Sequence, residues 1–183
     1  MKFSDVFKLF ASKGRALTVG EVALARSVFG DEIDYERVRL FQGGLSLKIT
    51  GIDGANAPDG NIYFVPSAYR EDFSSRDINE QAFFIHEMTH VWQHQHGVNL
   101  VLGYLREFAK HKGDYVQAYI LPEDDFDFKK YNIEQQARTI ENAFYFREFL
   151  KDKTLLPERR ENAEFLMQDM MRRLPPEFGT LNL

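Results

Sequence analysis

The sequence predicts a single α+β domain over residues 1–183, mainly helical, with a small sheet packed on one central helix. Three observations support this class. Apolar residues recur at helical spacing before and after a central region, about residues 36–66, that is rich in turn formers and short alternating runs. One helical stretch, about residues 79–96, is apolar on most sides, which is typical of a helix in the middle of a domain. The chain is long enough to bury a sizeable core, and no internal repeat divides it.

Two helices are expected within residues 1–30. The first is expected to end near Gly14, and its apolar residues follow helical spacing at Phe3, Val6, Phe7 and Phe10. The second is expected to begin after Thr18, because Thr18-Val-Gly-Glu21 has the pattern of a capping box. Gly30 is expected to stop this second helix.

Three short strands are expected within about residues 36–66. The first is expected at 38–41. The second is expected at 45–49, where apolar and polar residues alternate as in a half-buried strand. Residues 51–60 are rich in glycine, proline and aspartate and predict a loop. The third strand is expected at 61–65.

Four helices are expected downstream of the sheet, over about residues 79–96, 98–111, 132–151 and 158–174. Gly97 is expected to cap the first of them, and Asn132 is expected to begin the third as its N-cap. Residues 115–121 fit either a short strand or an ordered loop.

The most informative motif of the chain lies in the central helix and reads His86-Glu-Met-Thr-His90. Two histidines four residues apart lie on one face of a helix, where their rings can hold one metal ion. Glu87 lies beside them, where it can take a proton from a metal-bound water. Because this helix is apolar nearly all round, its polar face is not expected to be idle surface. The motif therefore predicts a zinc metallopeptidase with one Zn²⁺ per chain.

A catalytic zinc takes three protein ligands, so the two histidines need a partner from elsewhere. His94 continues their row but lies about 12 Å along the helix axis from the first histidine, too far for one ion. His96 points off that face. His111 remains open, at the end of a short helix. Glu134 is favoured, because a glutamate in the first turn of a second helix facing the motif is the gluzincin arrangement.

The segment His86-Glu-Met-Thr-His-Val-Trp-Gln93, followed by Tyr131-Asn-Ile-Glu-Gln-Gln-Ala137, resembles the zincin-like proteins described as Vgr-related in Gram-negative bacteria. These are associated with type VI secretion and Rhs-type toxins. The segments Leu17–Phe29 and Asn61–Val65 also match, so the resemblance covers roughly residues 15–150.

The resemblance implies a zincin fold in which His86, His90 and Glu134 are the metal ligands and Glu87 is the catalytic glutamate. One position departs from better-studied gluzincins. In those proteins an acidic residue one turn after the ligand glutamate often supports a ligand histidine, whereas this chain has Arg138 there. The departure leaves the support of the histidines without an assigned residue.

The predicted reaction is hydrolysis of a peptide or amide bond by a metal-activated water, with Glu87 as the general base. A further donor to the oxyanion is usual. Tyr119, Tyr131 and Arg138 are candidates for that role, and other tyrosines, Tyr104 and Tyr115, are also available.

The substrate is expected to be a protein or peptide, or a peptide cross-link of the cell wall. The strand at 61–65 either pairs with an extended substrate or is purely structural. The alternative function is a catalytically inactive zincin that acts as an adaptor, cargo or interaction domain linked to a secretion system.

Composition excludes several other classes. The chain has no cysteine, which excludes disulfides, Cys-rich zinc sites and thiol catalysis. Its net charge of −5 gives no basic footprint for nucleic acid. No run approaches the roughly 20 apolar residues that a membrane span needs, and the N-terminus lacks the apolar core of a signal peptide. We therefore expect a soluble protein, either cytoplasmic or exported by a route independent of a signal peptide, whose partners are a peptide or protein substrate and a secretion-system component.

Overall fold

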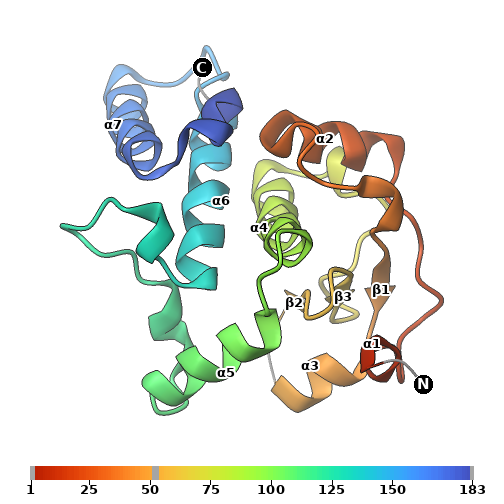
Figure 1. Cartoon of the computed structure of the whole chain (residues 1–183). Helices are drawn as coiled ribbons and strands as arrows, with labels where there is room; N and C mark the ends of the chain where they lie inside the picture. The colour runs from red at the N-terminus through yellow and green to blue at the C-terminus, as the bar shows by residue number, and fades with distance from the viewer. Residues whose placement is uncertain (1–2, 51–53, 182–183) are drawn as a thin grey trace.

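The computed structural model describes residues 3–50 and 54–181 of the chain (Figure 1). Its helices in chain order are α1 (Phe3–Phe7), α2 (Val19–Phe29), α3 (Leu45–Thr50), α4 (Ile78–Gln95), α5 (Leu100–Lys110), α6 (Ile133–Phe149) and α7 (Pro157–Arg173). One sheet is formed by β1 (Leu40–Gln42), β2 (Ala55–Asn56) and β3 (Ile62–Phe64). Within the described ranges the fold is mainly helical with one small sheet, so the predicted α+β class is confirmed.

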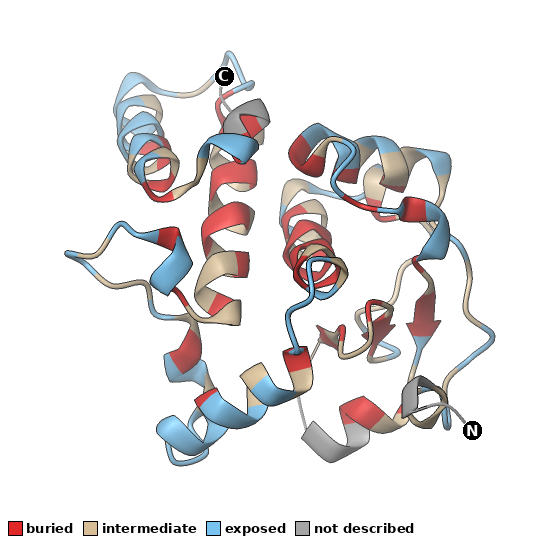
Figure 2. Cartoon of the chain, viewed as in Figure 1, coloured by how far each residue is buried: buried red, intermediate tan, exposed pale blue. Residues whose placement is uncertain are grey.

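Helix α4 lies at the centre of the domain, as the sequence predicts. Figure 1 shows it between α6 and α2, with the sheet on the side away from α6, and α4 contacts all three. Much of its ribbon has the colour of buried residues in Figure 2, and four of its large apolar side chains are fully buried, namely Phe84, Ile85, Met88 and Val91. Burying each such side chain stabilises the fold by roughly 1.5–3 kcal/mol. The helix that carries the motif is therefore held rigidly by the core.

Both ends of α4 are capped by local sequence. The side chain of Asp77 accepts hydrogen bonds from the backbone N–H groups of Asn79 and Glu80. At the other end, Gly97 follows the helix with a φ of 86° and donates its N–H to the carbonyl of His94. This is the terminating glycine that the sequence predicts.

The predicted capping box of α2 is also confirmed. The Thr18 hydroxyl accepts from the backbone N–H of Glu21, and the Glu21 carboxylate accepts from the backbone N–H of Thr18. Glu21 is fully buried, and Arg15 donates two hydrogen bonds of 2.7 Å to its carboxylate. The buried charge is therefore paired.

The predicted extent of the first helix is wrong. Helix α1 ends at Phe7, and Phe10 has a φ of 65°. The chain then runs extended beside β1, where Ala11 pairs with Gly43 and Arg15 pairs with Leu40. Backbone hydrogen bonds to the sheet region replace helical ones, so the helical spacing of the apolar residues was overridden by tertiary pairing.

The sheet has the strand order β1-β3-β2, with β1 parallel and β2 antiparallel to β3. The strands predicted at 38–41 and 61–65 are confirmed as β1 and β3. The strand predicted at 45–49 is wrong, because this segment forms α3. Gly43 and Gly44 have φ values of 79° and 140° and turn the chain away from the sheet directly after β1. An alternation this short does not distinguish a strand from a helical turn.

The edge strand β2 instead arises from the region predicted as a loop, 51–60, of which 51–53 lie outside the described residues. The downstream helices agree with prediction as α5, α6 and α7. Residues 115–121, predicted as a strand or loop, form a 3-10 helix at Tyr115–Tyr119. Asn132 caps α6 in a capping box with Gln135, as its position predicts. Over the described part of the chain, no helix combines the length and hydropathy needed to cross a membrane.

Candidate metal centre

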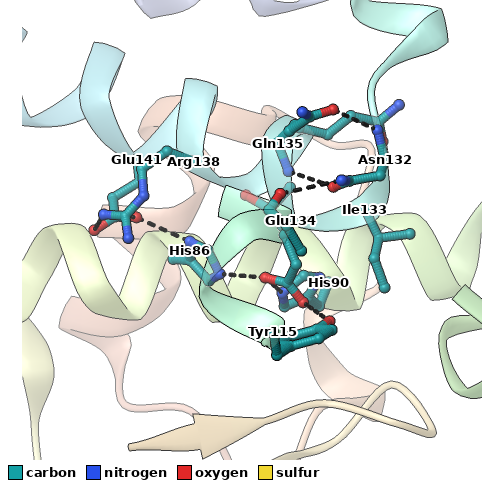
Figure 3. A network of polar contacts seen from close by, with 12 residues as sticks. His86, His90, Tyr115, Asn132, Ile133, Glu134, Gln135, Arg138 and Glu141 are labelled. Atoms are coloured by element: carbon teal, nitrogen blue, oxygen red, sulfur yellow. Dashed lines mark hydrogen bonds and ion pairs between the residues drawn. The ribbon is translucent and has the colours of Figure 1, made fainter. Parts of the chain in front are cut away.

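Three predicted ligands meet between α4 and α6. His86 and His90 come from one face of α4, and Glu134 comes from the first turn of α6 (Figure 3). The Oε2 atom of Glu134 lies 3.2 Å from Nε2 of His86 and 3.3 Å from Nε2 of His90. One ligand atom from each residue lies within 4.8 Å of the others, and all three residues are buried. We call these residues the His-His-Glu cluster.

The second nitrogen of each histidine ring is also held. Nδ1 of His86 lies 2.9 Å from Oε2 of Glu141, and Nδ1 of His90 lies 2.8 Å from Oε1 of Gln93. A carboxylate and an amide oxygen can only accept, so each Nδ1 must be the donor. This leaves the Nε2 lone pair of a neutral ring directed into the cluster, which is the tautomer that a metal ligand needs.

Gln93 also fixes the second helix of the site. Its amide nitrogen donates to the carbonyl of Ile133 and to Oε1 of Gln136, at 3.0 and 2.8 Å. Ile133 precedes the glutamate of the cluster, so one side chain orients a histidine on α4 and ties down the start of α6. Sequence analysis did not assign this role to Gln93, although its position three residues after His90 places it on a neighbouring part of the α4 surface.

Glu141 is the acidic residue that bonds to His86, although Arg138 occupies the position where gluzincins often have that acid. The acidic support for His86 comes from two turns after Glu134, on the same face of α6, and not from one turn after it. Arg138 occupies the intervening turn, and its Nη1 atom donates to Oε1 of Glu141 over 3.1 Å (Figure 3). The departure from the gluzincin pattern therefore moves the supporting acid by one turn and does not remove it. The helical spacing could have indicated Glu141.

The charges around the cluster favour a bound cation. Burial acts to lower the pKa of His86, but hydrogen bonds to Glu134 and Glu141 outweigh it and raise that pKa to about 10. Burial acts in the opposite direction on Glu134, yet the two histidines hold the pKa of this carboxylate well below its usual range. Without an ion, protonated histidines thus balance the carboxylates, and a metal cation can supply the same positive charge.

Glu87 lies beside the cluster in an unusual state. It is 3% exposed, and its Oε2 atom is the one buried side-chain nitrogen or oxygen in the described part of the chain that has no hydrogen-bond partner. Burial raises the pKa of this carboxyl. An unsatisfied buried carboxylate oxygen costs stability, so its presence calls for a functional explanation. Glu87 lines a cavity of about 240 Å³ together with His90 and Glu134.

Tyr115 and Tyr119 lie at the polar end of this cavity, and Tyr104, whose ring centroid is 4.5 Å from that of Tyr115, also lines it. The hydroxyl of Tyr115 donates to Oε1 of Glu134 over 2.7 Å (Figure 3). The ring of Tyr119 stacks against His86, with 5.8 Å between ring centroids, and the Arg138 guanidinium lies 5.4 Å from the Tyr119 ring centroid. Burial, followed by the charge of Glu134, raises the pKa of Tyr115 and Tyr119, so both hydroxyls stay protonated donors.

Tyr131, the other candidate stabiliser, is directed elsewhere. Its hydroxyl donates to the carbonyl of Asp125 and accepts from Arg173. The structure thus places Tyr119 at the cavity, Arg138 behind its ring, and Tyr131 in a separate network.

No protein-family model matches the chain. The chain is 42% identical over 158 residues to the type VI secretion system spike protein VgrG2b of Pseudomonas aeruginosa, which covers 85% of this chain but only 15% of that protein. It is also similar to the solved effector domain of Pseudomonas aeruginosa VgrG2b, with 38% sequence identity and a TM-score of 0.66 over 87% of this chain and 84% of that one. This chain belongs to the VgrG2b effector-domain family.

The other histidines of this VgrG2b-type domain lie outside the cluster. His94 and His96 are exposed, and His96 lies 3.2 Å from a carboxylate oxygen of Glu32. His111 lies 3.4 Å from Glu107 on α5. Of the third ligands weighed from the sequence, Glu134 is the one that reaches the two histidines of the motif.

The sheet of this VgrG2b-type domain also settles the place of residues 61–65. Strand β3 is the central strand and pairs on both sides, so the interpretation in which it pairs with a substrate is wrong. The edge next to the cavity is β2, whose residues Ala55 and Asn56 both line it. Edge strands can accept another extended segment, whereas central strands cannot.

Proposed function

We propose that this VgrG2b-type domain is a zincin-like, gluzincin-type metallopeptidase that binds one zinc ion through His86, His90 and Glu134. The observation that carries the proposal is the convergence of these three ligand atoms beside Glu87, whose Oε2 atom has no hydrogen-bond partner. Two imidazole nitrogens and one carboxylate oxygen form a donor set that catalytic zinc accepts, with a fourth position left for water. When bound, zinc would lower the pKa of that water towards about 7 and polarise the carbonyl to be attacked.

The protein groups then divide the remaining work. Glu87 takes the proton of the attacking water at its free oxygen and returns it to the leaving nitrogen. Its burial-raised pKa suits a group that must both accept and release a proton. Tyr119 donates its hydroxyl to the developing oxyanion, and Arg138 supports the ring from behind. Tyr115 is engaged with Glu134 and positions that ligand.

The substrate backbone is proposed to lie along β2. There it would contact Ala55 and Asn56, which both line the cavity. Because β2 and the Glu87 carboxylate line the same cavity, a peptide held there would be carried past the general base.

The family suggests how the domain is exported. Its relative is a type VI secretion system spike protein, so we propose that a component of that system is its partner and that it is exported without a cleaved signal peptide. The alternative, an inactive adaptor or cargo domain, leaves the unpartnered Oε2 atom of Glu87 unexplained, because a structural metal site does not need a general base.

The metal is the first property to test. Protein purified without a chelator or a histidine tag should contain one zinc per chain by elemental mass spectrometry. Glu134→Ala should lose zinc about as completely as His90→Ala, whereas His94→Ala should retain it. Full zinc content in Glu134→Ala would remove this ligand from the site. Hydrolysis of a peptide library by the zinc-loaded protein, absent after chelation and restored by zinc, would test the reaction.

A further inference from the structure

We infer that the substrate is an extended polypeptide with a bulky apolar side chain beside the cleaved bond. Leu100, Val101 and Leu105 of α5, which we call the α5 wall, would select that side chain. The inference rests on the proposed peptidase function, because it concerns the same cavity. It narrows the substrate from any peptide or amide to one class of polypeptide segment.

The carboxylate and imidazole groups that line the cavity are gathered at one end of it, and the neutral polar side chains of Ser46 and Asn56 also line it. Glu87, His90 and Glu134 lie at that end, with Tyr115 and Tyr119. Most of the remaining lining is apolar and comes from two sides, with Ala55, Ala57 and Pro58 facing Leu100, Val101 and Leu105. A substrate carbonyl at the polar end would therefore place a neighbouring side chain against apolar surface, where burial away from water is favourable.

The cavity is large enough to hold a bulky side chain. Its volume of about 240 Å³ lies somewhat below the roughly 300–1,000 Å³ of clefts that hold whole drug-sized ligands. A large aliphatic or aromatic side chain would fill much of this space. Alanine or glycine would leave most of the wall uncovered, and apolar surface left uncovered gives no binding energy.

Helix α5 is fixed against the start of the ligand helix. A Cβ atom at Gly103 would lie 2.9 Å from Cδ1 of Ile133, the residue that precedes Glu134. The absence of a side chain at Gly103 thus lets α5 approach α6 closely. The same contact therefore holds the apolar residues of α5 and the start of the helix that carries Glu134. Leu105 nevertheless remains 55% exposed while lining the cavity, so a substrate would cover it.

These features favour a polypeptide over a cell-wall cross-link. Cross-link peptides carry alanine and charged side chains, which would leave the α5 wall uncovered.

A matched pair of variants tests the wall. Leu102 and Leu105 are both leucines on α5 and both 55% exposed, but only Leu105 lines the cavity. We expect zinc-loaded wild-type protein to cleave a random decapeptide library with a large apolar residue enriched at one position beside the cleaved bond. Replacing that residue by alanine should lower kcat/KM by about tenfold or more. Leu105→Glu should abolish the enrichment, and Leu102→Glu should preserve it.

Binding separates this inference from the peptidase proposal. The zinc-loaded Glu87→Gln variant is mixed with the same library, and retained peptides are identified by mass spectrometry. If apolar peptides are retained but the wild type cleaves none of them, the peptidase proposal is wrong, whereas the inference about the α5 wall is supported. Cleavage or retention without an apolar preference would contradict the inference that the α5 wall selects the substrate. Cleavage of cross-linked cell-wall peptides alone would also contradict it.

Discussion

The two sides of the cavity are built on different principles. On the α4–α6 side, polar groups are buried and nearly all are bonded: His86 to Glu141, His90 to Gln93, and Gln93 onward to α6. On the α5–β2 side, the lining is largely apolar, and Leu105 is half-exposed. On the first side, hydrogen bonds fix the positions of the side chains, which suits holding an ion in one geometry. The second is incomplete by itself and suits a surface that a substrate completes.

The largest expected effect comes from Glu87, the residue with an unbonded oxygen on the polar side. Glu87→Gln should keep zinc and lower kcat by about 10²–10⁴-fold, because the amide cannot accept the proton of the attacking water. The same change should alter the stability of the fold little, since the Oε2 atom that it replaces has no hydrogen-bond partner. Hydrolysis of a reporter peptide and urea unfolding measure the two effects. Glu164→Gln, at an exposed position of α7, is the matched control. Wild-type turnover in Glu87→Gln would mean that another group is the base.

The next effect tests whether the bonded side is what holds the metal. Glu141→Ala should weaken zinc binding by about 10–100-fold, because His86 would lose the acceptor that orients its ring. Glu148→Ala is a suitable control, since this acid lies on the same helix but pairs with Arg147 and Lys151. Competition with a fluorescent chelator gives both affinities. Equal affinities in the two variants would show that Glu141 does not support the site.

A third effect concerns the proton on His86, which a zinc ion must displace when it binds. Without an ion, the pKa of His86 is raised to about 10, so its contribution to stability is fully present below about 6.5 and is lost as pH rises through about 10. Zinc requires the neutral ring, so its affinity should rise with pH across this window, by up to about tenfold per pH unit for each proton displaced. Urea unfolding and zinc titration at several pH values should therefore show opposite trends. Parallel trends would contradict proton displacement at this histidine.

The same contrast explains what the sequence could predict. His86 and His90 were found from the spacing of one helical motif, whereas Glu134 was favoured because its place in a second helix matches the gluzincin arrangement. The supports Gln93 and Glu141 were missed, because helical spacing places them near the ligands but does not show that they bond to the histidine rings or, for Gln93, to α6. The α5–β2 side was predicted less well, since the alternation at 45–49 became α3 and the edge strand arose in a predicted loop. Short segments there take their structure from the turn glycines and from tertiary pairing.

The smallest expected effect is at the junction of the two sides. Gly103→Ala places a methyl group 2.9 Å from Cδ1 of Ile133, and the contact must relax by a small shift of α5 or of that side chain. Alanine favours a helix over glycine by about 1 kcal/mol, which offsets strain of similar size. The free energy of unfolding should thus change by less than about 1 kcal/mol, while the apolar preference of the cavity changes. If instead zinc is lost, the wall and the ligand helix cannot move independently, and the two sides of the cavity act as one unit.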